Sequence, residues 1–161
     1  MEDCNGKKNL LKVTRLERRW REKTIIIDRR QANRKNLYCI GILRSLLGMR
    51  LSEVMLNGDY IYKGILTESY VAGQFKAAGI PLYYWRDENM AEVDFLLDTP
   101  DGIAPAEVKS GDNKRSASME LFRKQFSPEK LYRISANNFG ATQGLFSVPL
   151  YAAHLLAECN V

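Results

Sequence analysis

The spacing of hydrophobic residues changes along the chain, and each spacing predicts a different element. Between Leu37 and Leu47, apolar residues recur every three or four positions, which predicts a helix that ends at Gly48. The clearest helix is predicted for 64–78, because Gly79-Ile80-Pro81 follows it and cannot continue a helix. The apolar face of that helix consists of Ile65, Leu66, Val71 and Phe75. Further helices are predicted at 52–56, 116–125 and 150–158.

Shorter apolar runs between these helices predict strands at 82–86, 91–97, 103–109, 130–135 and 145–148. The second and third of these runs are joined by Thr99-Pro100-Asp101-Gly102, a strong turn signal. Proline fixes φ at the second turn position, and glycine tolerates a positive φ. The order of helices and strands predicts an α/β fold, with a central mixed β-sheet flanked by helices.

Charged residues recur at alternate positions of the two strands that this turn connects. Side chains alternate across a strand, so Glu92 and Asp94 share a face of the first strand. Glu107 and Lys109 share a face of the second strand in the same way. The positions expected to pack in the core opposite these charges are Val93, Phe95 and Val108.

The register of this hairpin decides whether its two charged faces coincide. A two- or four-residue loop centred on the middle of 99–102 places Asp94 opposite Glu107, with Cβ atoms roughly 4.5–5.5 Å apart. A three-residue loop with a bulge at Gly102 moves Glu107 to the other face. The sequence alone leaves both registers open.

Two carboxylates that face each other repel, and they therefore need a cation or a proton between them. A small number of carboxylate oxygens, with room for water, suits Mg²⁺ or the alternative ion Mn²⁺. Lys109 adds a positive charge that could act on water or on a phosphate, and Glu68 could supply a third carboxylate from helix 64–78. The plain alternatives are a surface ion pair at Glu107 and Lys109 and a solvated Glu68.

These residues resemble a known superfamily. The hairpin is similar to the PD-(D/E)xK, or restriction-endonuclease-like, superfamily. More narrowly, the chain from about Leu37 onward resembles a domain of unknown function found at the C-terminus of many prokaryotic AAA-type ATPases. The segments that carry the resemblance are Gly64-Ile65-Leu66-Thr67-Glu68-Ser69-Tyr70-Val71-Ala72, Leu82-Tyr83-Tyr84-Trp85-Arg86, Glu92-Val93-Asp94-Phe95, Glu107-Val108-Lys109-Ser110-Gly111 and Val148-Pro149-Leu150-Tyr151.

The resemblance implies a restriction-endonuclease-like core at 37–161. It implies Asp94 and Glu107 as metal ligands, Lys109 as the catalytic lysine, and Glu68 as a helix carboxylate that assists with metal and catalysis. It also implies an AAA-type ATPase domain as a partner. The chain has no Gly-rich loop ending in Gly-Lys-Ser/Thr, so we do not expect it to bind ATP through a P-loop.

Charge is divided unevenly along the 161 residues, a length that suits one domain. Residues 1–36 hold 12 Lys/Arg and 5 Asp/Glu, whereas 37–161 hold 12 and 14. The basic arm at 1–36 either binds phosphate or is a solvated, disordered or truncated leader. The three widely spaced cysteines and the lack of a long apolar stretch favour a cytoplasmic protein with no membrane span.

These observations lead to a nuclease-like domain, a candidate Mg²⁺-dependent endonuclease acting on DNA, as the expected function. The alternative is a catalytically inactive module that binds nucleic acid or protein and regulates or targets an ATPase partner. Substrate strandedness and oligomeric state are not determined by the sequence. Three candidates are weaker. His154 is expected to be structural or at the surface, and the aromatic run Tyr83-Tyr84-Trp85 is better explained as a core strand. The basic residues that form either a phosphate track or scattered charge are Lys114, Arg115, Arg123, Lys124, Lys130 and Arg133.

Overall fold

A computed structural model of the chain describes residues 39–52, 62–87, 91–111 and 116–160. In chain order, the elements are α3 (Ile40–Leu46), α5 (Lys63–Ala77), β1 (Tyr83–Arg86), β2 (Glu92–Thr99), β3 (Gly102–Lys109), α6 (Ala117–Phe126), β4 (Leu131–Ser135), β5 (Gly140–Thr142), β6 (Leu145–Pro149) and the 3-10 helix η1 (Leu150–Asn160).

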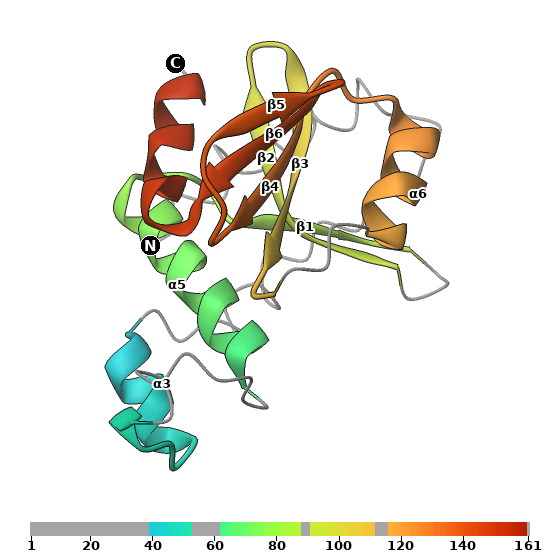
Figure 1. Ribbon diagram of the computed structural model, residues 1–161. Helices are drawn as coiled ribbons and strands as arrows, with labels where there is room; N and C mark the ends of the chain where they lie inside the picture. The colour runs from blue at the N-terminus through green and yellow to red at the C-terminus, as the bar shows by residue number, and fades with distance from the viewer. Residues whose placement is uncertain (1–38, 53–61, 88–90, 112–115, 161) are drawn as a thin grey trace, which may run out of the picture.

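The six strands form one mixed sheet in the order β1-β2-β3-β4-β6-β5 (Figure 1). β1, β2 and β3 are antiparallel neighbours, because short connections join them. α6 then crosses the sheet and returns the chain so that β4 runs parallel to β3. β6 is parallel to β4, and β5 pairs with β6 in the antiparallel sense at the edge. The predicted α/β class and mixed sheet are confirmed.

Helices cover both faces of the sheet, and each face has its own hydrophobic cluster. α5 and η1 pack on one face, where Phe75 of α5 meets Phe95 of β2 edge to face at 5.2 Å between ring centroids. α6 packs on the other face, where Phe122 meets Trp85 of β1 at 5.4 Å. Figure 1 shows α6 on the opposite side of the sheet from α5 and η1.

The turn between β2 and β3 adopts the register that a loop centred on Pro100 and Asp101 requires. Thr99 pairs with Gly102, and the ladder continues to Phe95 and Ala106 without a shift. Gly102 has φ of 123°, a conformation that favours glycine. The three-residue loop is therefore wrong.

Most predicted elements agree with the structure to within a few residues. The differences concern one side chain, one additional strand and the type of the terminal helix. Ile65 was expected on the buried face of its helix but is 46% exposed. β5 was not predicted, because all three of its residues are exposed and lack an apolar pattern. The terminal helix is a 3-10 helix rather than an α-helix.

Several expectations fall on residues outside the described ranges. They are the basic arm at 1–36, the short helix at 52–56 beyond its first residue, and the basic residues Lys114 and Arg115. Within the described part of the chain, every helix is too short or too polar to cross a membrane.

Candidate active site

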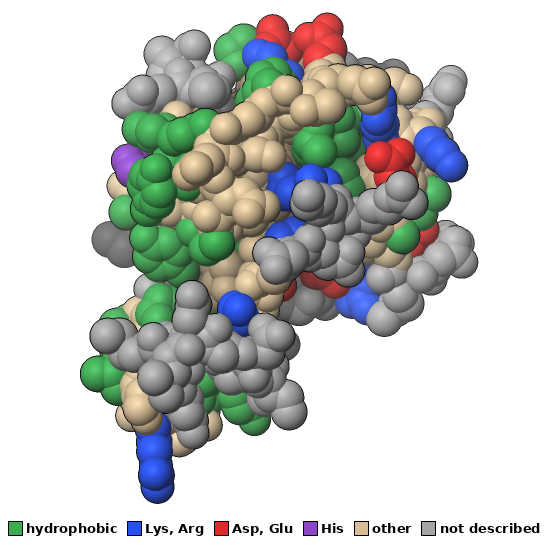
Figure 2. All heavy atoms as spheres, in the orientation of Figure 1, with side chains coloured by type: hydrophobic (Ala, Val, Ile, Leu, Met, Phe, Trp, Pro, Cys, Tyr) green, Lys and Arg blue, Asp and Glu red, His purple; other side chains and the backbone are tan. Residues whose placement is uncertain are grey.

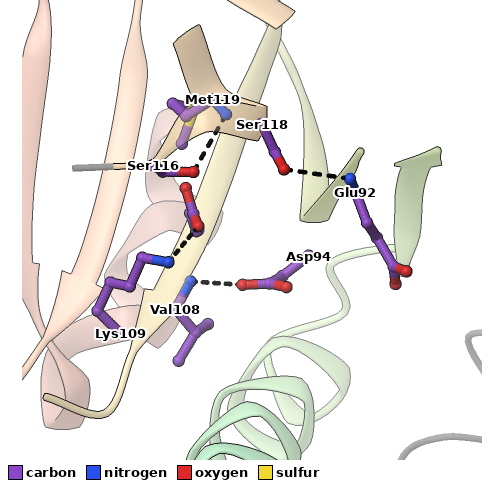
Figure 3. Close-up of polar contacts among 8 residues, drawn as sticks. Glu92, Asp94, Val108, Lys109, Ser116, Ser118 and Met119 are labelled. Carbon is purple, nitrogen blue, oxygen red and sulfur yellow. Dashed lines mark hydrogen bonds and ion pairs between the residues drawn. The ribbon is translucent and has the colours of Figure 1, made fainter. Parts of the chain in front are cut away.

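The candidate site lies where β2 and β3 separate. The ladder between them ends at Phe95 and Ala106. Before that point β2 pairs with β1, and beyond it β3 pairs with β4. Asp94 is the first residue of β2 inside this fork, and its Oδ2 accepts a hydrogen bond of 2.7 Å from the backbone N–H of Val108 (Figure 3). The carboxylate thus takes the place of a strand partner for an amide that the fork leaves unpaired.

An irregularity in β2 explains how Asp94 reaches this position. Tyr83 pairs with Leu96, but Trp85 pairs with Val93, so two residues of β2 oppose the single residue Tyr84. Such a bulge redirects the side chains on one side of it.

Because of the bulge, the hydrophobic core differs from the predicted one. Val93 was expected to pack with Phe95 and Val108, but it lies in the cluster beneath α6. Phe95 and Val108 lie in the cluster beneath α5. The alternation rule fails here because the extra residue changes the face that each earlier side chain meets.

The environment of Asp94 raises its pKa so far that the neutral and ionised forms are about equally populated near pH 7. Burial raises the pKa of Asp94 from 3.8 to about 7, and the negative charge of Glu68 adds to this effect. The Val108 amide lowers the pKa, Glu107 raises it, and Lys109 lowers it, each by less than the burial does. These influences show that α5 and β3 bring their charged residues into electrostatic range of Asp94.

Glu107 and Lys109 form an ion pair on the α6-facing side of β3. The Lys109 Nζ lies 2.5 Å from the Glu107 Oε1. Glu107 is 7% exposed, and a buried carboxylate of this kind requires a counter-charge. Arg133 of β4 is the parallel-strand neighbour of Glu107 and lies on the same face.

The four predicted site residues therefore occupy one region but different sides of it. Glu68 approaches Asp94 from α5, whereas Glu107 and Lys109 project toward α6. Among the described residues, no group of three His, Cys, Asp or Glu side chains is placed to hold one metal ion. Mg²⁺ commonly takes only one or two carboxylates and completes its shell with water and substrate phosphate, and the partly buried Asp94 carboxylate, when ionised, fits that demand.

Glu92 does not join this group. Its backbone N–H donates to the Ser118 hydroxyl at 3.3 Å, and Figure 3 shows its side chain directed away from Asp94. Ser116 caps α6 by accepting from the Met119 N–H at 3.1 Å. The start of α6 is thereby fixed against the start of β2, beside the candidate site.

Two contributors to the site were not predicted from the sequence. The Val108 amide carries no side-chain signal, and only the fork in the sheet exposes it. Arg133 was noted as a basic residue, but its place beside Glu107 depends on the parallel register of β3 and β4. The Arg-x-Ser pattern of β4 holds no signal strong enough to reveal that register.

A family model described as a domain of unknown function (DUF4143) matches residues 63–152, more than half of the chain. The chain belongs to this family. The DUF4143 match begins at the first residue of α5 and ends within η1, so it contains all six strands and all four predicted site residues. No curated protein and no solved structure gives a significant match to the chain.

The remaining candidates have structural positions within the DUF4143 domain. The exposed His154 interacts with the Gln74 Oε1 through its backbone N–H and its Nδ1, and Gln74 in turn donates to the Leu150 carbonyl at 2.6 Å. These contacts join η1 to α5. The aromatic residues of β1 are all buried in the sheet, as the core-strand interpretation predicts; they are Tyr83, Tyr84 and Trp85.

Proposed function

We propose that this DUF4143 domain is nuclease-like and hydrolyses phosphodiester bonds in DNA with Mg²⁺, or with Mn²⁺ in its place. The observation that carries the proposal is the partly buried Asp94 carboxylate in the β2–β3 fork, within electrostatic range of Glu68, Glu107 and Lys109. An acidic group that is still about half protonated near pH 7 is characteristic of functional sites, because folding alone does not require such a residue.

Each side chain has a distinct part in the proposed reaction. Asp94 would hold the metal from within the fork and Glu107 from the adjoining side of β3, with Glu68 assisting from α5. When bound, the metal would supply Lewis-acid stabilisation of the phosphate and a lowered pKa for a coordinated water. Lys109 would orient the attacking water or stabilise the negative charge that develops on the phosphate.

The atoms of the reaction balance without any further reactant. The oxygen of water forms a new bond to phosphorus, and the phosphorus–oxygen bond to one sugar breaks. The proton released from water passes to solvent, and the leaving oxygen takes up one proton.

Glu107 keeps Lys109 beside the site, and the ion pair is short enough to fix the ammonium group in place.

The fold supports the restriction-endonuclease-like part of this proposal. Such a core has a central mixed sheet flanked by helices, and the charged hairpin occupies two interior strands of the sheet in this chain. The family match supports an association with an AAA-type ATPase domain, through the resemblance described above. We propose a cytoplasmic setting for the same reasons of composition.

A cleavage assay tests the proposal. Plasmid and single-stranded DNA are incubated with Mg²⁺ or Mn²⁺ and with the wild type, Asp94→Ala or Lys109→Ala. We expect cleavage by the wild type and a loss of at least about 100-fold in each variant, because each removes a group that acts in the transition state. Asp98→Ala is the matched control, since Asp98 lies on the same strand but is exposed. Identical traces from all four proteins would remove the catalytic claim.

The second candidate function is a non-catalytic module that binds nucleic acid or protein and regulates an ATPase partner. Two observations favour it: the ion pair that already neutralises Glu107, and the excess of acidic residues in 37–161. In that case wild type and Asp94→Ala would bind DNA equally, and neither would cleave it.

A further inference from the structure

A groove of about 580 Å³ lies between α6 and the strands β4 and β6. Its floor is apolar and is formed by Leu131 and Leu145, which are partners in neighbouring strands. One wall is the flank of α6 that carries Met119 and Arg123. The other is the turn at Gln143, where β5 meets β6. We call this hollow the α6 groove.

The α6 groove begins beside the candidate active site. Arg133 lines it, and Arg133 is the β4 neighbour of Glu107. Ser116, the residue that caps α6, also lines it. Adjacent strands lie about 4.8 Å apart, so the groove floor continues directly into the strand that carries Glu107 and Lys109.

The lining has the two chemical features that a single strand of nucleic acid needs. Arg123 and Arg133 supply positive charge for phosphates, and the leucines of the floor supply an apolar surface for bases. Figure 2 shows Lys and Arg side chains on this face of the molecule, between the sheet and α6. Glu120 is the acidic residue of the lining, and it lies 4.0 Å from Arg123 in an exposed, weak ion pair.

The chemistry of the groove favours one strand rather than two. Its volume falls in the range of roughly 300–1,000 Å³ that holds a small ligand. Bases can stack on its apolar lining only when they are unpaired, because the bases of a duplex are already stacked and paired with each other.

The rim opposite α6 is already formed. Gln143 and Gly144 both have positive φ, at 48° and 80°, and they make the tight turn between β5 and β6. The Leu131 N–H donates to the Gly144 carbonyl at 2.9 Å, which ties this turn to the start of β4. These contacts fix the turn at Gln143 relative to the groove floor.

We infer that the α6 groove binds the unpaired nucleotides that flank the scissile phosphate, so that the domain prefers single-stranded DNA to duplex DNA. This inference rests on the proposed function for the position of the phosphate. Arg133 and Arg123 contact successive phosphates, and the apolar floor contacts the bases between them.

The test is fluorescence anisotropy with a labelled oligothymidine and with a blunt duplex of the same length, in EDTA, so that binding is measured without cleavage. We expect the wild type to bind the single strand at least about tenfold more tightly than the duplex. Arg123→Gln and Arg133→Gln should each weaken binding about fivefold and reduce the salt slope by about 0.7. Glu120→Gln should strengthen binding about twofold, because it removes a negative charge from the lining.

Lys124→Gln is the matched control, because Lys124 is exposed on α6 next to Arg123 but does not line the groove. It should leave affinity within about twofold of the wild type. Equal affinity for the two DNA forms, absence of binding, or equal losses in Lys124→Gln and the arginine variants would overturn the inference. A wild type that binds as expected but fails the cleavage assay would contradict the proposed reaction and leave the groove assignment intact.

Discussion

At the scale of single residues, the most informative feature is the conflict between Asp94 and its surroundings. Its carboxyl group is partly buried, and Glu68 adds a second negative charge nearby. One backbone hydrogen bond from Val108 compensates only in part. A residue that opposes stability in this way is best explained by a role that needs a concentrated negative charge.

Asp94→Asn is expected to stabilise the protein at pH 8. The pKa of Asp94 is raised from 3.8 to about 7 on folding. Protonation of Asp94 therefore stabilises the folded state fully below pH 3.8, and this stabilisation is lost as the pH rises through about 7. The asparagine carries no charge at any pH. Its oxygen can still accept from the Val108 N–H. We therefore expect urea denaturation at pH 8 to show a free energy of unfolding higher by up to about 4 kcal/mol.

The same comparison at pH 5 tests whether the stabilisation by Asp94→Asn depends on the charge of the wild-type carboxylate. There the wild-type Asp94 is largely protonated in the folded state, so the gain from Asp94→Asn should be much smaller. Asp98→Asn, on the exposed face of the same strand, should change stability by less than about 0.5 kcal/mol at either pH. A loss of stability in Asp94→Asn that is equal at pH 5 and pH 8 would refute the assigned burial of its charge.

At the scale of elements, α6 both covers one face of the sheet and places its N-terminus near the candidate site. Its apolar side covers one face of the sheet through Phe122 and Phe126, which pack on Trp85. Its N-terminus is fixed near the candidate site by the Ser116 cap and by the bond from the Glu92 N–H to Ser118. The position of α6 thus couples the packing of the sheet to the geometry of the α6 groove.

Phe122→Ala should detach α6 from the sheet. Phe122 is fully buried, and its ring lies 4.5 Å from that of Phe126 and 5.4 Å from that of Trp85, between centroids. We expect a loss of about 3–5 kcal/mol in the free energy of unfolding, measured by chemical denaturation. Leu121→Ala is the control on the same helix, since Leu121 is 38% exposed, and it should cost less than about 1 kcal/mol. Equal losses in the two variants would contradict the packing described for α6.

Local sequence signals were sufficient to predict most elements and to limit the β2–β3 hairpin to two registers, between which the structure decides. The turn preference of Pro100 and Gly102 depends on only a few neighbouring residues, and the folded protein has a turn at this position. The helix α5 was predicted for the same reason, although Ile65 on its expected apolar face is exposed. That residue lies near the start of the helix, on a side that the described part of the sheet does not cover.

The arrangement inside the site depends on contacts that no local pattern records. The bulge at Asp94 and Phe95 arises from pairing with β1, and it reverses the face on which Val93 lies. The position of Arg133 beside Glu107 arises from a parallel pairing across the α6 crossover. Which charged residues belong together could thus be predicted, but not which sides of the sheet they occupy.

At the scale of the whole molecule, the positive charge and the candidate site lie in different parts of the chain. Residues 1–36 carry an excess of seven basic residues, whereas 37–161 carry an excess of two acidic ones. The α6 groove has only two arginines and one glutamate of its own. We therefore propose that the basic arm attracts nucleic acid in general and that the groove places the strand.

Replacing Arg18, Arg19 and Arg21 with glutamine tests this division. Affinity for single-stranded DNA should fall, and the salt slope should decrease by about two, because up to three phosphate contacts are removed. The preference for single strands over duplexes should persist, since the groove is unchanged. Anisotropy titrations at several salt concentrations measure both quantities. A loss of the strand preference, with an unchanged salt slope, would show that the two roles are wrongly assigned.

We propose that Asp94 is a ligand of a divalent metal ion, and titration calorimetry with Mn²⁺ at pH 6, 7 and 8 measures that binding. A carboxylate must lose its proton to bind a metal. Because the pKa of Asp94 is about 7, we expect saturable binding by the wild type that is about tenfold tighter at pH 8 than at pH 6. Asp98→Asn should behave as the wild type, and Asp94→Asn should lose the binding. A wild type without saturable binding, or an Asp94→Asn isotherm equal to that of the wild type, would contradict the account.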